Sequence, residues 1–143
     1  MKNELNPYVR RVQLGEVAPP PISTTLGGRI VSLAADGSRI ECEYTADERF
    51  LNPAGQVQGG MLAAMLDDVT AWLVTAALAE HEHCATLNLN TSFLRAAGPG
   101  PLRGTATLVR RGRNVCNVDG QLWQGDKLVA TASAVCMVAR GGA

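Results

Sequence analysis

One segment constrains the fold of this chain more than any other. Between Met61 and Leu78 the residues are almost wholly apolar, apart from two threonines and two adjacent carboxylates, Asp67 and Asp68. The segment is just long enough to span a membrane, but each aspartate at the centre of a spanning helix costs roughly 2.5–3.5 kcal/mol. We therefore expect a helix buried inside a globular fold, and no membrane partner.

Strand patterns flank this helix on both sides. Before it, two strand-like segments meet at Asp36-Gly37, a strong turn signal, and in the second of them apolar and charged residues alternate. After it come four more segments, separated by turns that contain glycine. The expected strands are Gly28–Ala34, Ser38–Thr45, Cys84–Leu94, Leu102–Arg111, Asn114–Gln124 and Lys127–Ala139.

The order of these elements predicts an α+β fold. A helix that is apolar nearly all round needs cover on every side, and a curved antiparallel sheet of about five to six strands wrapped around it would supply that cover. Residues 1–143 fit a single domain of ordinary size. Within it, residues 1–24 are expected to form an N-terminal helix, around Pro7–Leu14, and a proline-rich lead-in that ends near Pro21.

The overall charge argues against nucleic acid or a membrane surface as a general partner. Lysine and arginine number 13, as do aspartate and glutamate, so the formal net charge is zero. The N-terminus lacks the apolar stretch of a signal peptide, and the four cysteines lack CxxC spacing, which indicates reduced core thiols in a cytoplasmic protein. Neither these cysteines nor His81 and His83 have the spacing of metal ligands, so we expect no metal site.

The start of the long helix carries groups that could act on a carbonyl. Gly59 and Gly60 would expose backbone N–H groups at a helix N-terminus, which favours an anion or an oxygen that is becoming one. Asn52 and Gln58 place two amides in the preceding loop. Two turns into the helix, Asp67 places a carboxylate among apolar neighbours. A buried carboxylate must be paired with another group, be protonated, or serve a function. Taken alone, the glycines could equally form a turn without a ligand, and the aspartate could be structural.

The pattern Asn52-x5-Gln58-Gly59-Gly60-x6-Asp67 resembles the motif of the hot dog fold acyl-CoA thioesterases, in particular the phenylacetate-degradation and human thioesterase-superfamily type. That motif reads Asn, five residues, His-Gly-Gly, and an acidic residue nine positions after the His. The resemblance covers roughly residues 25–139, and the strand order agrees throughout. It implies the hot dog fold and hydrolysis of an acyl-CoA thioester, without a metal and without a separate cofactor because coenzyme A is part of the substrate.

The resemblance also implies a role for each matching residue. Asp67 takes the place of the acidic residue that activates water or attacks the thioester, and Gly59 that of the glycine whose N–H polarises the carbonyl. Asn52 matches the amide of the loop, and Thr86 falls where the human-type enzymes carry a serine that helps to orient water. Asp68 has no role from the motif. Because successive helical residues point about 100° apart, Asp67 and Asp68 cannot both face one small site.

Two positions depart from the family. Gln58 stands where the family has His, and an amide can hydrogen-bond the thioester oxygen but cannot carry a proton. Ala71 stands where some bacterial aryl-CoA thioesterases have Thr. Two alternatives therefore stay open: a non-catalytic acyl-CoA-binding protein, and an acyl-CoA hydratase or dehydratase of the same fold. The sequence does not reveal whether the acyl group is aliphatic or aryl.

Basic residues gather at one predicted hairpin turn, which reads RRGR from 110 to 113. In the resembling family this turn and the end of the preceding strand contact coenzyme A, whose phosphates suit guanidinium groups. A solvated turn is the alternative. By analogy, Arg95 is expected near this turn in the fold. The residues expected to bind the coenzyme A part are Gly60, Arg95, Arg110, Arg111 and Arg113.

Helix geometry predicts a site shared between two chains. Gly59 and Asp67 are eight residues apart, which is about 12 Å along a helix axis, whereas both must reach one thioester carbonyl group. A second chain with its helix alongside, in the opposite direction, would bring its own Gly59 to the first chain's Asp67. The resembling family builds its sites in this way, often as dimers of dimers. We therefore expect an obligate homodimer with shared active sites and, beyond it, a homotetramer.

Overall fold

The computed structural model describes residues 4–141, which form helices and one antiparallel sheet. The helices are α1 (Pro7–Gln13), α2 (Pro21–Thr25), the short 3-10 helix η1 (Glu48–Phe50) and α3 (Gly59–Ala76). The strands are β1 (Arg29–Leu33), β2 (Arg39–Ala46), β3 (Glu82–Phe93), β4 (Gly100–Arg111), β5 (Val115–Gln124) and β6 (Lys127–Arg140).

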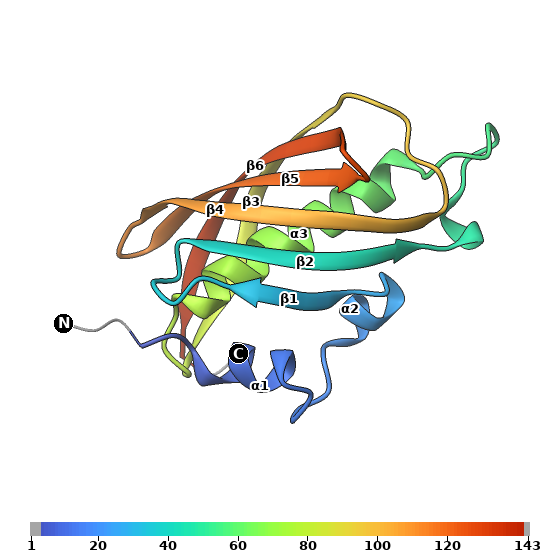
Figure 1. Ribbon diagram of the computed structural model, residues 1–143. Coiled ribbons are helices and arrows are strands. Elements are labelled where there is room, and N and C mark those ends of the chain that lie inside the picture. The colour runs from blue at the N-terminus through green and yellow to red at the C-terminus, as the bar shows by residue number, and fades with distance from the viewer. Residues whose placement is uncertain (1–3, 142–143) are drawn as a thin grey trace.

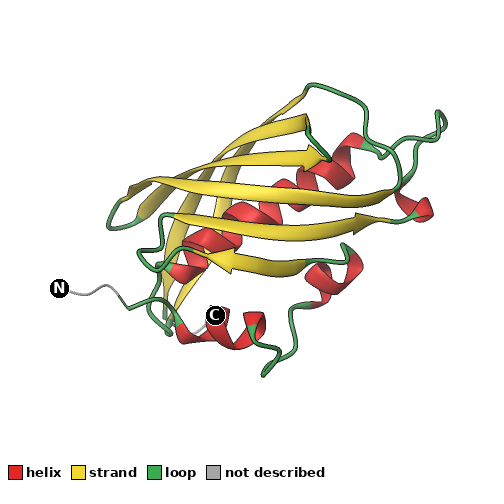
Figure 2. Cartoon of the chain, viewed as in Figure 1, coloured by secondary structure: helices red, strands yellow, loops and turns green. Residues whose placement is uncertain are grey.

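The six strands form a single curved sheet in the order β1-β2-β4-β5-β6-β3. Every neighbouring pair is antiparallel, and β1 and β3 are the two edge strands. Figure 1 shows the sheet curving over α3, and Figure 2 shows this helix lying along one face of the sheet. The expected α+β architecture, a long helix wrapped by an antiparallel sheet, is confirmed.

The hairpin of β1 and β2 forms as the sequence predicts. Gly37 in its turn has a φ of 73°, a left-handed conformation that glycine adopts without a steric penalty. In β2 the side chains of Ile40, Cys42 and Tyr44 are each about 1% exposed. Alternation along this strand therefore separates a face that packs on the helix from a face that meets solvent.

Close packing joins α3 to the middle of the sheet. Leu66, Val69 and Leu73 of the helix are fully buried. A sheet glycine permits this approach, because a Cβ on Gly120 would lie 3.0 Å from Thr70 and 3.4 Å from Leu66 of the helix. Gly104 instead leaves space for the ring of Tyr44, since a Cβ there would lie 2.9 Å from that ring. The core of the fold is the layer between the sheet and the helix.

One stripe of α3 is only partly covered by its own chain. Gly60 is exposed, and Ala64, Asp67, Ala71 and Thr75 are only half-buried. Spacings of three and four residues put these positions on one face of the helix. The stripe faces the edge strand β3, where Thr86 contacts Asp67, and the cover that one chain gives to this side of the helix is incomplete.

The N-terminal segment contacts the end of α3. The helix stops at Ala76, and the backbone N–H of Asn6 donates to the free Ala76 carbonyl at 2.9 Å. The side-chain amide of Asn6 reaches the Ala79 carbonyl at 3.4 Å. These contacts hold α1, the expected N-terminal helix, against the end of α3. The short helix α2 was not expected; it starts at Pro21, and proline suits the first position of a helix.

Two sequence-based expectations concern a possible membrane span and the cysteines. No helix between residues 4 and 141 has the length and apolar character needed to cross a membrane. All four cysteines are free thiols. Cys42, Cys116 and Cys136 are buried and Cys84 is half-buried, which confirms their expected place in the core.

Candidate active site

The two adjacent carboxylates of α3 point to different places. Asp68 faces the core beside β2 and α2, where its carboxylate accepts hydrogen bonds from the Tyr44 hydroxyl at 2.7 Å and the Ser23 hydroxyl at 3.2 Å. Asp67 faces β3 instead. This difference agrees with the turn of about 100° between successive helical residues. Sequence reasoning left the role of Asp68 open, and the structure assigns it to a buried polar cluster.

Burial governs the electrostatics of that cluster. It raises the pKa of the Asp68 carboxyl above its ordinary value, although the hydrogen bonds from Tyr44 and Ser23 oppose the shift. Burial also raises the pKa of Tyr44, so its hydroxyl stays protonated and able to donate. The Asp68 cluster links α3 to β2 and α2, and it is occupied by the chain's own side chains.

Asp67 meets the edge strand through one short hydrogen bond. The hydroxyl of Thr86, in β3, donates to the Oδ1 atom of Asp67 at 2.8 Å. Both residues are half-buried, Asp67 on the stripe of α3 and Thr86 on the edge strand that faces it. The structure thus brings together two residues that the sequence placed in one site. A carboxylate held in this way can accept a proton from water or attack a carbon atom.

Thiol groups lie directly behind this pair. The sulfur of Cys136, on β6, is 3.9 Å from the Thr86 hydroxyl. A hydrogen bond between the thiols of Cys84 and Cys136 lowers the pKa of Cys136, and the same contact together with burial raises the pKa of Cys84. The wall behind Asp67 is therefore made of small sulfur-containing side chains.

The head of α3 has the donors that the sequence predicts. Gly59 and Gly60 occupy the first turn, whose N–H groups have no acceptor within the helix. A Cβ on Gly59 would lie 3.3 Å from the ring of Phe93, so a side chain here would press on the end of β3. A pocket of about 320 Å³ opens beside Gly59, between Leu62 and the segment that contains Phe93 and Arg95.

The two amides before the helix differ in what they do. The side-chain oxygen of Asn52 accepts hydrogen bonds from the N–H groups of Ala54 at 3.0 Å and Gln56 at 3.1 Å, and so shapes the loop itself. Gln58 is the N-cap residue of α3; its backbone N–H is fixed to the Phe50 carbonyl at 2.8 Å. The Gln58 side chain does not cap the helix and is exposed. Its amide is therefore available to a ligand at the helix head.

A single chain keeps the two halves of this site apart. Gly59 and Asp67 are on the same helix, about 12 Å apart along its axis. They also face different parts of β3, because Gly59 lies against Phe93 whereas Asp67 is bound by Thr86. The chain therefore carries a donor site and a carboxylate site, separated along the uncovered stripe.

The basic turn between β4 and β5 lies at one end of the sheet. The guanidinium of Arg111 donates to the carbonyls of Gly112 and Arg113 and is 3.8 Å from the carboxylate of Glu82. Arg110 and Arg113 are exposed. Arg111 thus stiffens the turn, and its two neighbours present their charges to solvent.

Arg95 lies at the other end of the sheet. It follows Phe93, the last residue of β3, and its guanidinium donates to the Leu128 carbonyl at 3.3 Å. The basic turn instead meets the first residue of β3 through the contact of Arg111 with Glu82. The expectation that Arg95 lies near the turn is therefore wrong within one chain, because the length of β3 separates them.

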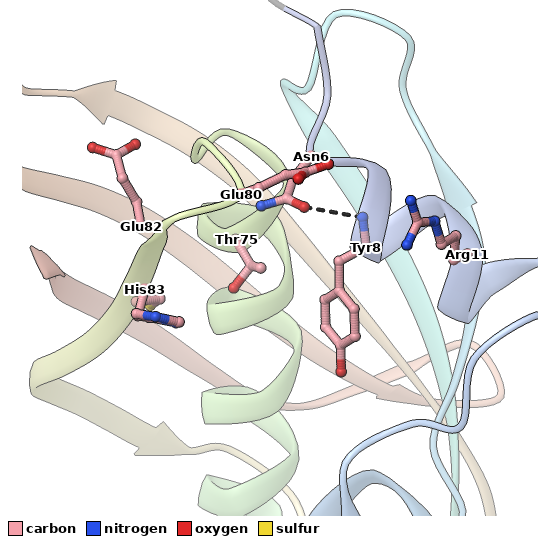
Figure 3. A pocket seen from close by; sticks show the side chains of 8 residues that line it. Asn6, Tyr8, Arg11, Thr75, Glu80, Glu82 and His83 are labelled. Carbon is pink, nitrogen blue, oxygen red and sulfur yellow. Dashed lines mark hydrogen bonds between the residues drawn. The ribbon is translucent and has the colours of Figure 1, made fainter. Parts of the chain in front are cut away.

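Sequence reasoning missed a second pocket at the far end of α3. It has a volume of about 540 Å³ and lies between α1, the last turn of α3 and the start of β3 (Figure 3). Its lining includes Asn6, Tyr8, Arg11, Thr75 and Cys84. The position of α1 could not be read from the sequence, so these residues gave no signal of a pocket. In the described range 4–141, no three His, Cys, Asp or Glu side chains gather so that they could hold a metal ion.

Comparison with known proteins supplies the family. A family model described as the acyl-CoA thioesterase N-terminal domain matches residues 51–137. In structure, the chain is similar to a proposed thioesterase from Ralstonia eutropha JMP134, a phenylacetic acid degradation-related protein. The two share 58% identity with a TM-score of 0.88, over 91% of this chain and 98% of the other.

More distant relatives agree. The chain is 30% identical over 106 residues to a proposed esterase from Mycobacterium tuberculosis, covering 72% of this chain and 71% of the relative. A conserved protein from Pseudomonas aeruginosa is 26% identical with a TM-score of 0.78, over 85% of this chain and 95% of the other. With its central helix wrapped by six antiparallel strands, the chain belongs to the acyl-CoA thioesterase family of hot dog fold.

Proposed function

We propose that this protein hydrolyses the thioester bond of acyl-CoA, with Asp67 as its catalytic carboxylate. The observation that carries the proposal is the 2.8 Å hydrogen bond from Thr86 to Asp67, on an uncovered stripe of the central helix. Asp67 activates a water molecule or attacks the thioester carbon directly, and Thr86 orients the carboxylate and the water. The family supplies the substrate class.

The donors at the head of α3 stabilise the oxygen of the thioester. The N–H of Gly59 polarises the carbonyl, and the exposed amide of Gln58 adds a second hydrogen bond. Gly60 leaves space for the ligand, since nothing lies within 4 Å of a Cβ built there. Asn52 holds the loop from which Gln58 reaches the substrate.

A second copy of the chain completes the site. Edge strand β3 presents a row of unpaired backbone groups, and the side chain of Leu87 in its middle is 59% exposed. If two copies of β3 pair antiparallel about a two-fold axis, Thr86 can lie opposite Phe93 of the partner subunit. That register brings Gly59 of the partner subunit to Asp67 and covers the open stripe of α3. The homodimer therefore has two shared sites.

The same pairing explains how the basic residues can act together. With Phe93 of the partner subunit opposite Thr86, Arg95 of the partner subunit approaches the first residues of β3. Arg111 contacts Glu82 there. We propose that Arg95, Arg110, Arg111 and Arg113 bind the phosphates of coenzyme A across this interface. Association of two dimers into a homotetramer is proposed from the family resemblance.

Two further proposals complete this reading. One sheet and one cluster of buried residues join the described elements, which supports a single domain over residues 1–143. Four free thiols suit a reducing compartment, so we propose that the protein acts in the cytoplasm.

The test compares the two adjacent aspartates. Asp67→Asn should lower the rate of coenzyme A release from a panel of acyl-CoA thioesters by about 10²–10⁴-fold, the usual contribution of a general base. Asp68→Asn is the matched control: it makes the same chemical change one residue away, at a carboxylate occupied by Tyr44 and Ser23. It should keep most of the activity. Loss in Asp68→Asn and retention in Asp67→Asn would overturn the assignment. Binding of acyl-CoA without release would favour a non-catalytic binding protein.

A further inference from the structure

The hydroxyl of Thr86 has a second neighbour besides Asp67. Its oxygen is 3.9 Å from the sulfur of Cys136, within reach of a hydrogen bond that involves sulfur. Thr86 and Cys136 are directly paired across β3 and β6, so their side chains lie on the same face of the sheet. Cys136 is fully buried. A thiol that solvent does not reach can affect the reaction only through its neighbours.

The supply of hydrogen atoms fixes the direction of the bond between Thr86 and Cys136. An ionised carboxylate only accepts, and a threonine hydroxyl has a single hydrogen. That hydrogen goes to Oδ1 of Asp67 at 2.8 Å. Thr86 therefore has only lone pairs left for its other neighbour, and the thiol of Cys136 is the donor between them.

A second thiol extends this chain of donors. The thiol of Cys84 is hydrogen-bonded to that of Cys136. Because the S–H of Cys136 is directed at Thr86, the S–H of Cys84 is directed at the sulfur of Cys136. Three hydrogens then point the same way, ending at Asp67. Aligned hydrogen bonds polarise one another in a buried site, which strengthens the last one, to the carboxylate.

We propose that Cys136 is a positioning residue for the reaction, because its thiol holds the Thr86 hydroxyl in the orientation in which it donates to Asp67. The inference rests on the proposed hydrolysis at Asp67 and adds to it a buried residue that acts through Thr86. A threonine hydroxyl rotates to suit its neighbours. Without the thiol, the Thr86 hydroxyl therefore donates to Asp67 for only part of the time.

Loss of the Cys136 proton reverses the contact. The hydrogen bond from Cys84 lowers the pKa of Cys136 to about 7, although burial and the charge of Asp67 oppose the shift. A thiolate has no hydrogen to donate, so it accepts instead and competes with Asp67 for the single hydrogen of Thr86. We therefore expect kcat to fall as pH rises through this ionisation.

The other titratable groups near Cys136 lie toward β5. Cys116 is paired with Cys136 in the register of β5 and β6 and is equally buried. Burial raises the pKa of Cys116, and the guanidinium of Arg111, which is itself beside Glu82, opposes this rise. In the described part of the chain no hydrogen bond joins Cys116 to Thr86. Cys116 is therefore a matched control for Cys136.

The pH profile of kcat tests the proposal. Coenzyme A release from acetyl-, octanoyl- and benzoyl-CoA is measured between pH 6 and pH 8.5, and the thioester that the wild type hydrolyses fastest is used throughout. At pH 6, Cys136→Ala should lower kcat by about two- to tenfold, the worth of one neutral hydrogen bond. The wild-type kcat should fall by a similar factor as pH rises to 8.5, whereas that of Cys136→Ala should stay level. Cys116→Ala makes the same change in an equally buried place and should keep both the wild-type rate and its fall.

A further variant keeps the test decisive if Cys136→Ala folds poorly. Cys84→Ala removes the hydrogen bond that lowers the pKa of Cys136 and leaves burial, which raises it. The fall in kcat should therefore move to higher pH. In a Thr86→Val background, Cys136→Ala should have no further effect on kcat, because no hydroxyl remains to be oriented.

The outcomes separate the inference from the function on which it rests. Equal losses of kcat in Cys136→Ala and Cys116→Ala, with the same pH profile, would mean that the thiol acts only by packing. That result would overturn the inference and leave the proposed function standing. A fall in kcat that does not move in Cys84→Ala, or effects of Cys136→Ala and Thr86→Val that simply add, would also overturn it. No release from any of the three thioesters by the wild type would overturn the proposed function, and the inference with it.

Discussion

The hydroxyl of Thr86 donates a 2.8 Å hydrogen bond to Oδ1 of Asp67, so the edge strand of the sheet orients a carboxylate carried by the central helix. The neighbouring carboxylate, Asp68, is held by Tyr44 and Ser23 on the other side of the same helix turn. One aspartate is thus joined to the core, and the other to the open edge.

The contact between Thr86 and Asp67 makes a direct prediction for catalysis. Thr86→Val removes the hydroxyl and keeps the shape, so Asp67 loses its orienting partner. A hydrogen bond to a charged group is worth about 1.5–3 kcal/mol, which corresponds to a fall in kcat of roughly 10–100-fold if the bond persists in the transition state. Thr86→Ser keeps a hydroxyl and should keep most of the activity. Equal activity of the Val and Ser variants would show that the contact is only structural.

Gln58 allows a test of how the thioester oxygen is stabilised. Gln58→Ala removes an exposed amide at the head of α3 and should lower turnover by about 10²–10³-fold, as losing one oxyanion donor does elsewhere. Gln58→His restores the residue of the family motif and should retain or raise activity. Initial rates of coenzyme A release distinguish the variants. A wild-type chain without activity that becomes active as Gln58→His would favour a protein that binds acyl-CoA and has lost catalysis.

The exposed arginines of the β4–β5 turn should affect binding more than chemistry. Arg110→Ala and Arg113→Ala should each raise KM for acyl-CoA about two- to fivefold at low salt, the effect of one exposed ionic contact. The change should shrink at high salt because exposed charges are screened. Arg29→Ala is the control, since Arg29 is exposed on β1, the edge strand farthest from β3 in the order of the sheet. No change in KM for either variant would show that the turn is a solvated surface that does not bind coenzyme A.

Much of the fold could be predicted because its signals are local. The apolar run of α3, the alternation in β2 and the left-handed glycine at Gly37 each act within a few residues. The family resemblance placed Asp67 and Thr86 in one site, but not their direct contact, and a spacing of 19 residues carries no periodic signal. The features that the sequence could not reveal depend on contacts between segments that are far apart in the chain.

Three features illustrate that limit. The partners of Asp68 lie 24 and 45 residues away on other elements, so no local pattern points to them. The Ala76 carbonyl at the end of α3 accepts a hydrogen bond from Asn6, which is 70 residues earlier in the chain. Arg95 was expected near the basic turn by analogy with the family, whereas the length of β3 keeps them apart within one chain.

The Asp68 cluster makes a prediction for stability. Tyr44→Phe removes a donor from a buried carboxylate and should lower the free energy of unfolding by about 1.5–3 kcal/mol at neutral pH. Burial raises the folded-state pKa of Asp68, so the folded protein holds this proton more tightly than the unfolded chain does. Stability contributed by the protonated form is therefore present at low pH and lost as pH rises through that raised pKa. The loss caused by Tyr44→Phe should be largest where Asp68 is ionised and should shrink on acidification.

Urea unfolding of four proteins checks this account: wild type, Tyr44→Phe, Asp68→Asn and the double variant. In the Asp68→Asn background no charge remains, so Tyr44→Phe should cost less and should show no dependence on pH between 4 and 7. A penalty that is independent of pH in both backgrounds would mean that the tyrosine hydroxyl stabilises the fold without acting on the carboxylate.

Subunit mixing tests whether each site is shared. Asp67→Asn and Gln58→Ala subunits should each be nearly inactive alone, because each removes one half of every site in its own homodimer. In a mixed dimer, one interface receives both defects and the other receives neither, since Asp67 of one chain works with the helix head of the other. Equal mixing makes about half of the dimers mixed, so roughly a quarter of the sites become intact. Coenzyme A release should recover to about that fraction, while native mass spectrometry follows the exchange. If exchange is complete and activity does not return, each chain carries its own whole site, and the 12 Å that separates Gly59 from Asp67 along α3 must be bridged in another way.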